Sequence, residues 1–142
     1  METLLDASET KQRLLQHGAT LGGILLLLIA LAAVARPGGG LNVAGGIAAA
    51  LGLAAIILGL RVKIGWQVRY KGHVIRFEND PLIGEQLYID EERVGRGYFG
   101  FHVVMNAAIP KGNGAGDRIE SVSNAGLVRF HCRITATPAT AS

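Results

Sequence analysis

Residues 14–60 read LLQHGATLGGILLLLIALAAVARPGGGLNVAGGIAAALGLAAIILGL and carry one formal charge, at Arg36. That charge divides the stretch into apolar segments of about 22 and about 24 residues, and at about 1.5 Å per helical residue each can cross roughly 30 Å of hydrocarbon. Pro37 and the three glycines that follow it favour a tight reversal. The sequence therefore predicts a two-helix transmembrane hairpin over residues 18–61, with its turn at 36–40.

Small residues recur along both predicted spans. Helices associate in lipid by close backbone approach, so such positions are candidates for helix packing. The helix-packing candidates are Gly45, Gly52 and Gly59 in the second span and Gly18, Gly22, Gly23 and Ala30 in the first. Two interpretations stay open: packing within one hairpin, and self-association into a homo-oligomer.

The charges that flank the spans predict an orientation. Lys11 and Arg13 precede the first span, whereas Arg61 and Lys63 follow the second. The positive-inside bias places both termini in the cytoplasm of a two-pass protein of the inner (plasma) membrane. The small-x-small sequence that ends at Ala35 leaves an alternative open, in which a signal peptide is cleaved there and the rest is periplasmic.

Residues 1–17 predict a short polar helix that continues into the first span, because Asp6 to Glu9 has the acceptor and acid spacing of a helix start. The alternative is an amphipathic surface helix that uses Leu4, Leu5, Leu14 and Leu15.

From Trp66 onward the hydrophobic period changes to two, which is typical of strands. Trp66 itself fits either an interfacial anchor or the first core residue of a sheet. Residues 62–135 therefore predict a small antiparallel all-β domain, a sandwich or a partly open barrel of about six strands, and residues 136–142 predict a disordered tail. The predicted strands are Trp66–Tyr70, Ile75–Glu78, Glu85–Asp90, Tyr98–Met105, Asp117–Ser123 and Leu127–Thr135.

The candidate catalytic features are weak. Glycines 112, 114 and 116 lack the Gly-Lys-Ser/Thr ending of a nucleotide loop and predict a flexible connection. The acidic run from Asp90 to Glu92 predicts a solvated turn, because consecutive strand residues face opposite ways. The same alternation separates Cys132 from His131, and the histidines lack zinc spacing. We expect no enzyme activity, no metal site and no cofactor.

A basic row is the most distinctive polar feature of the predicted domain. Arg129, His131 and Arg133 alternate with apolar residues in the last predicted strand, and Arg69 and Arg76 could lie beside them. Such a face could bind anionic lipid headgroups or a small anionic ligand. The alternative is a solvated face that acidic residues on a neighbouring strand neutralise.

Two resemblances are present. Phe77-Glu78-Asn79, Gly84-Glu85 and Leu87-Tyr88-Ile89-Asp90 resemble a strand-turn-strand of the Fas apoptosis inhibitory molecule family, over about 14 residues of generic hairpin chemistry, from which no function follows. The overall arrangement is similar to the membrane-anchored β-barrel effectors of bacterial anti-phage nucleotide signalling, a likeness of architecture.

These patterns predict a non-enzymatic, membrane-anchored binding, scaffolding or regulatory module. Its expected partners are membrane lipid, further copies of itself through the transmembrane helices, and an unidentified protein or small anionic ligand. The modest excess of basic residues does not predict nucleic acid. The alternative function is a ligand-gated membrane effector whose β domain senses an anionic small molecule such as a cyclic nucleotide.

Overall fold

The structure is a computed structural model that describes residues 1–35, 43–98 and 100–139. The chain forms two compact units. One, here called the β unit, comprises Met1–Arg13 together with Lys63–Ser142. The other, the helix pair, comprises Leu14–Val62. The predicted turn at 36–40 and the last residues of the predicted tail lie outside the described residues.

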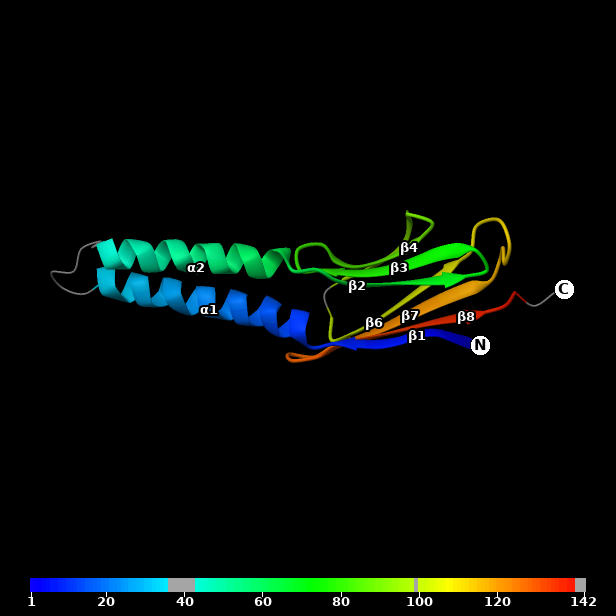
Figure 1. The fold of residues 1–142 in the computed structure, drawn as a ribbon, viewed down its shortest axis with the longest axis horizontal. Helices are drawn as coiled ribbons and strands as arrows, with labels where there is room; N and C mark the ends of the chain where they lie inside the picture. Colours follow the sequence, from blue (N-terminus) through cyan, green and yellow to red (C-terminus); the bar gives the residue numbers. More distant parts are fainter. Residues whose placement is uncertain (36–42, 99, 140–142) are drawn as a thin grey trace. The chain divides into compact units, whose positions relative to one another are not determined.

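The β unit contains eight described strands in two antiparallel sheets, drawn in Figure 1. One sheet has the order β1-β8-β7-β6 and the other the order β2-β3-β4-β5. The two sheets share one core, so the β unit is a sandwich of two four-stranded layers. The strands are β1 (Glu2–Glu9), β2 (Ile64–Tyr70), β3 (His73–Asp80), β4 (Gly84–Ile89), β5 (Glu92–Gly97), β6 (His102–Ala108), β7 (Arg118–Ala125) and β8 (Phe130–Thr137).

The predicted N-terminal helix over residues 1–17 is wrong for its first half. Residues 2–9 form β1, which pairs antiparallel with β8, and Leu4 and Leu5 pack against the core. The helix begins only at Lys11, where the Glu9 carboxylate accepts a hydrogen bond from the backbone N–H of Gln12 at 3.1 Å. The helix therefore starts about one turn later than predicted. For the residues before it, sheet pairing and core burial outweigh local helix propensity.

Aromatic and aliphatic side chains fill the core between the sheets. Phe77 from one sheet and Phe130 from the other are fully buried, with ring centroids 6.0 Å apart. Trp66 stacks on Phe130 at 5.8 Å and lies 6.1 Å from Phe77. Trp66 is therefore a core-packing residue of β2, which decides between its two predicted roles.

Two-residue turns set the register of the sheet that begins with β2. Lys71 and Gly72 join β2 to β3 with φ of 49° and 91°, and Asp90 and Glu91 join β4 to β5 with φ of 50° and 68°. Positive φ at both central residues is the geometry that matches strand twist in a hairpin. The predicted hairpin at Lys71-Gly72 and the predicted turn at Asp90 are confirmed.

The strand predictions are also wrong elsewhere. Tyr98, Phe101 and Leu127 are each predicted to lie in a strand, but they lie in the connections before β6 and β8. The predicted turn includes Glu92 and no strand is predicted over residues 93–97, but residues 92–97 form β5 along the edge of its sheet. The predicted tail loses its first two residues to β8, which continues through Ala136 and Thr137 beside β7, with Ala136 fully buried.

The helix pair consists of α1 (Lys11–Val34) and α2 (Val43–Arg61). Each is long and apolar enough to cross a membrane. The buried residues of α2 are Gly45, Gly52 and Gly59, spaced seven apart. A Cβ built on Gly52 would lie 2.8 Å from the carbonyl oxygen of Gly23, and one on Gly59 would collide with Thr20. The glycine ridge of α2 therefore packs against α1 of the same chain.

Gly23 and Ala30 are the buried small residues of α1, as predicted. Gly18 and Gly22 are not part of this contact. A Cβ on either would meet nothing within 4 Å in the described part of the chain. The reason is helical phase: Gly23 and Ala30 are seven residues apart and share a face, which Gly18 and Gly22 do not.

Candidate functional site

The predicted basic row lies on the outer side of the sheet formed by β1, β8, β7 and β6. Asp6 on β1 is the register partner of Arg133 and approaches it at 3.4 Å, and Asp6 also lies 2.6 Å from His131 Nε2. The hydrogen bond from His131, with the charge of Arg133, lowers the pKa of the Asp6 carboxyl. Arg129 donates to the hydroxyl of Ser8 at 2.7 Å. A cross-strand acid therefore neutralises part of the row, as the alternative interpretation predicted.

A shallow groove of about 230 Å³ runs over this face, and its lining is mixed. It includes the side chains of His131 and Arg133, but also the carboxylate of Glu120 and the hydroxyls of Thr3 and Thr135. Because acidic and basic side chains both line it, this groove is better matched to a partner surface of mixed charge than to selective binding of an anion.

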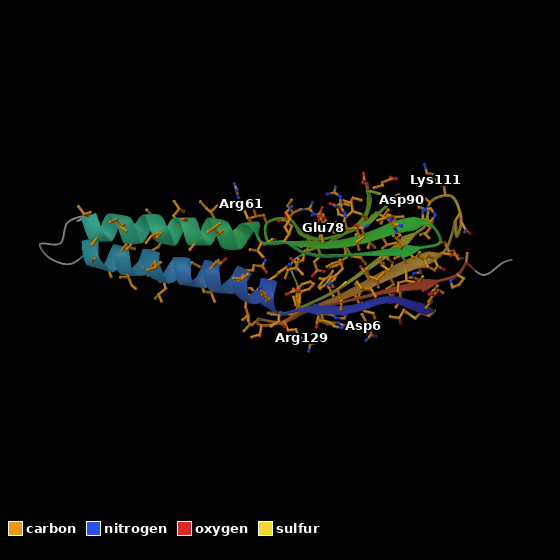
Figure 2. All side chains as sticks on the ribbon, in the orientation of Figure 1. Asp6, Arg61, Glu78, Asp90, Lys111 and Arg129 are labelled. Atoms are coloured by element: carbon orange, nitrogen blue, oxygen red, sulfur yellow. The ribbon has the colours of Figure 1, made fainter. Side chains whose placement is uncertain are left out.

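Arg69 and Arg76 do not join this row. They lie on β2 and β3 of the other sheet, and Figure 2 shows the two outer faces on opposite sides of the β unit, with Asp6 and Arg129 on one and Glu78 on the other. Arg76 pairs with Glu78 at 2.9 Å and lies over the Tyr88 ring at 4.5 Å. The five predicted ligand-facing residues thus form two separate groups. Sequence reasoning could not place strands of different sheets.

A second groove, of about 390 Å³, lies on this other face. It is lined by Gln67, Val74, Arg76, Asp90 and Glu91. Two of these residues are acidic and one is basic, so this groove also has mixed charge.

Two ends of the β unit differ in chemistry. The junction end is where β1 finishes at Glu9 and β2 begins at Ile64; the far end carries the turns at 71–72 and 90–91 and the loop at 109–117. At the far end Asp117 accepts hydrogen bonds from Lys71 at 2.7 Å and Tyr70 at 3.0 Å. The bond from Lys71 is the main cause that lowers the pKa of Asp117, and burial, with the Asp117 contact, raises the pKa of Tyr70.

The glycine loop at 109–117 is held in place by these contacts. The backbone N–H groups of Ala115, Gly116 and Asp117 all donate to carbonyls of the same loop. His73 lies 3.1 Å from the carbonyl oxygen of Asn113. The loop is predicted to be a flexible connection, but hydrogen bonds hold it to itself and to His73. The three amides donate within the loop, so they are not directed at an anion.

His73 joins the loop to the neighbouring turn. Its Nδ1 lies 2.5 Å from the Asp90 carboxylate, while its Nε2 faces the carbonyl oxygen of Asn113. Both partners accept hydrogen bonds, so the ring satisfies both when it is protonated. The bond from His73 lowers the pKa of Asp90. This cluster links residues 17 and 40 positions apart, a separation that leaves no local signal in the sequence.

A buried carboxyl joins the two sheets. Glu85 on β4 is 3% exposed and accepts a hydrogen bond from the Ser123 hydroxyl on β7. Burial raises the pKa of Glu85, against the opposing effect of the Ser123 bond and the Arg13 charge. Burial likewise raises the pKa of Cys132 to about 12, so this thiol is not a thiolate nucleophile at neutral pH.

No family model, curated protein or solved structure matches this chain. Among residues 1–35, 43–98 and 100–139, no three His, Cys, Asp or Glu side chains are grouped to hold a metal ion. The polar groups described above mostly fasten strands and loops to one another.

Proposed function

We propose that this chain is a non-enzymatic two-pass membrane protein whose β sandwich acts as a binding or scaffolding module at the cytoplasmic face of the inner membrane. The observation that carries the proposal is the insertion of the apolar helix pair between β1 and β2 of one sandwich. Both ends of the anchor belong to the same folded unit, so an even number of crossings is required. Two helices of sufficient length and apolarity supply that number.

The insertion also supports an uncleaved N-terminus. Cleavage after Ala35 would release β1, whose backbone pairs with β8 from Glu2 to Glu9. The released sandwich would expose the edge of β8 and lose the packing of Leu4 and Leu5. The basic residues at the two ends of the pair favour the cytoplasmic orientation.

The test is a topology assay with engineered cysteines. Cys132 is fully buried and serves as a silent background, so Glu2→Cys and Lys111→Cys, both at exposed positions, each report on one part of the β unit. With an impermeant thiol reagent, we expect neither site to react in intact cells and both to react after permeabilisation. Alkaline carbonate should leave the chain in the membrane fraction. Labelling of one site but not the other in intact cells would overturn the insertion argument, and labelling of both would reverse the orientation.

A ligand-gated effector is the second candidate, and one contact favours it. Arg13, in the first turn of α1, donates from Nε to the carbonyl oxygen of Gly126 at 3.0 Å and lies over the Phe130 ring at 5.5 Å. The turn that it contacts precedes β8, which carries the basic row, so a ligand on that row could act on the start of α1. This candidate predicts growth arrest on overexpression, lost in the variant Arg129→Ala with Arg133→Ala and kept in Arg69→Ala. Arrest that persists in the double variant would remove it.

A further inference from the structure

Exposed large apolar side chains of the β unit gather in three connections. Their exposed fractions range from 42% for Ile83 to 81% for Phe101. In the described part of the β unit, the other exposed large apolar residues are Met1 and Val104. The gathered residues, here called the apolar tips, are Leu82 and Ile83 between β3 and β4, Tyr98 and Phe101 between β5 and β6, and Leu127 and Val128 between β7 and β8.

All three connections lie at the junction end. The β7–β8 turn adjoins the last residue of β1, since Glu9 is the register partner of Phe130. The β3–β4 turn adjoins the first residue of β2, since Ile64 pairs with Asn79. The backbone N–H of Ala125 donates to the carbonyl oxygen of Phe101 at 2.8 Å, which fastens the third connection beside β7. Figure 1 shows the β7–β8 turn, in orange, at the end of the β unit where β1 gives way to α1.

Chain length ties this end to the hairpin. One residue separates Glu9 from the start of α1 at Lys11, and two separate Arg61 from Ile64. Two extended residues span at most about 7 Å. If the helices cross a bilayer, these short connections keep the junction end within a few residues' length of the membrane surface. The far end has no such connection.

Cationic and aromatic groups accompany the tips. Arg96 lies over the Tyr98 ring at 5.6 Å and reaches the carbonyl oxygen of Ile83 at 3.4 Å. Lys63, beside the exit of α2, pairs with Asp80 at 2.9 Å. Tyrosine rings and basic side chains next to aliphatic ones are the composition of membrane-interface segments. A fully aqueous loop does not need these apolar groups.

We infer that the apolar tips insert into the interfacial layer of the membrane that the hairpin crosses. The inference rests on the proposed membrane anchoring. It assigns lipid contact to the loops, not to the basic row on the sheet face.

Site-specific quenching in full-length protein tests the inference. A fluorophore would be attached at Leu127→Cys, at Lys111→Cys on the far end and at Leu28→Cys in α1, with the chain in nanodiscs of phosphatidylcholine and phosphatidylglycerol. Native Cys132 stays unlabelled because it is fully buried. Brominated acyl chains should strongly quench the fluorescence of the probe at position 28. They should lower the fluorescence of the probe at 127 several-fold and leave that of the probe at 111 almost unchanged.

The outcomes separate this inference from the proposal beneath it. Quenching at 28 without quenching at 127 overturns lipid insertion and leaves the anchoring intact. No quenching at 28 overturns the anchoring itself. Protection of the 127 probe from aqueous iodide without quenching by bromolipid means that protein, such as a second copy, covers the tips, and this also overturns the inference.

A charge substitution supplies a second measurement. With the probe moved to Phe101→Cys, adding Val128→Asp should reduce bromolipid quenching severalfold, because a buried carboxylate disfavours insertion of the neighbouring tip. The matched control Asn113→Asp adds the same charge at the far end and should leave the quenching unchanged. Equal quenching in the two variants would contradict insertion. Both substituted positions are exposed, so folding should be preserved in each variant.

Discussion

Phe77 and Phe130 in the β unit and Gly23 and Gly52 in the helix pair hold their respective parts of the chain together in opposite ways. The two phenylalanines are fully buried and fill the space between sheets with ring against ring. The two glycines have no side chain, so the helix backbones approach so closely that a Cβ on Gly23 would lie 2.5 Å from the Gly52 carbonyl oxygen.

If the helix pair lies in lipid, as proposed, the solvent explains the difference. In water, burying large apolar side chains is the main source of stability. In lipid that force is absent between helices, and close backbone contact replaces it. The β unit should therefore be sensitive to lost atoms and the helix pair to added ones.

Deleting residues 2–9 should have the largest effect. The loss of β1 uncovers the edge of β8 and the Leu4 and Leu5 side of the core, so the β unit should unfold while the helical signal persists. Trypsin resistance and near-ultraviolet circular dichroism measure this, with Glu2→Gln as a control that keeps the strand. A β unit that stays folded without these residues would support a detached N-terminal helix instead.

Phe77→Ala tests the filled core. Removing this ring should lower the free energy of unfolding of the β unit by about 3–5 kcal/mol. The control Phe101→Ala removes the same ring from a side chain that is 81% exposed, and should stay within about 0.5 kcal/mol in detergent. Chemical unfolding followed by Trp66 fluorescence gives both values, and equal losses would refute the core assignment.

Gly52→Leu tests the close packing of the glycine ridge of α2 against α1. The added side chain meets the Gly23 backbone and should cost about 1–3 kcal/mol or force the helices apart. Gly22→Leu adds the same side chain where a Cβ meets nothing within 4 Å of described structure, and should be tolerated. Spin-label distances between α1 and α2 in detergent report the separation. A large effect at Gly22 would indicate that this face packs against something else, such as another copy.

Asp117→Asn should destabilise the β unit at neutral pH, because it weakens the bonds from Lys71 and Tyr70. The folded-state pKa of Asp117 is lowered, so its stabilisation is present above the unfolded pKa and is lost as pH falls through the folded value. The midpoint difference between variant and parent in thermal unfolding should therefore shrink on acidification. A difference that does not depend on pH would contradict an ionic role.

Glu85→Gln should have the smallest effect on stability, and it should stabilise the β unit where the preceding substitutions destabilise. The folded-state pKa of Glu85 is raised by burial, so stability is full below the unfolded pKa and falls as pH rises through the folded value. The amide removes this loss and can still accept from Ser123, so the variant should melt higher than the parent at neutral pH and alike at pH about 4. The control Glu78→Gln changes a carboxyl on the outer face. A variant that melts lower at neutral pH would show that the charge of Glu85 is stabilising.

Much of the fold could be predicted where the signal is local. The apolar helices, the glycine ridge and the Lys71-Gly72 hairpin follow from period and turn chemistry. Alternation in the last predicted strand points four residues inward; Phe130, Cys132 and Ile134 are buried, but Val128 lies in the turn before β8 and is 55% exposed. The candidate site was less accessible. The basic row was placed on one strand, but its neutralising partner Asp6 comes from a segment predicted to be helical.

The sequence by itself determined which segments are apolar enough for a membrane and which alternate as strands, because hydrophobic period and glycine spacing are properties of neighbouring residues. Tertiary structure decided that residues 2–9 belong to the sandwich, that Arg76 and Arg133 lie on opposite faces, and that Asp117 holds Lys71 and Tyr70. The pairing of β1 with β8 and the partly buried Lys71–Asp117 ion pair join residues more than forty positions apart. Their free energy depends on the assembled sheets, which no local window of sequence contains.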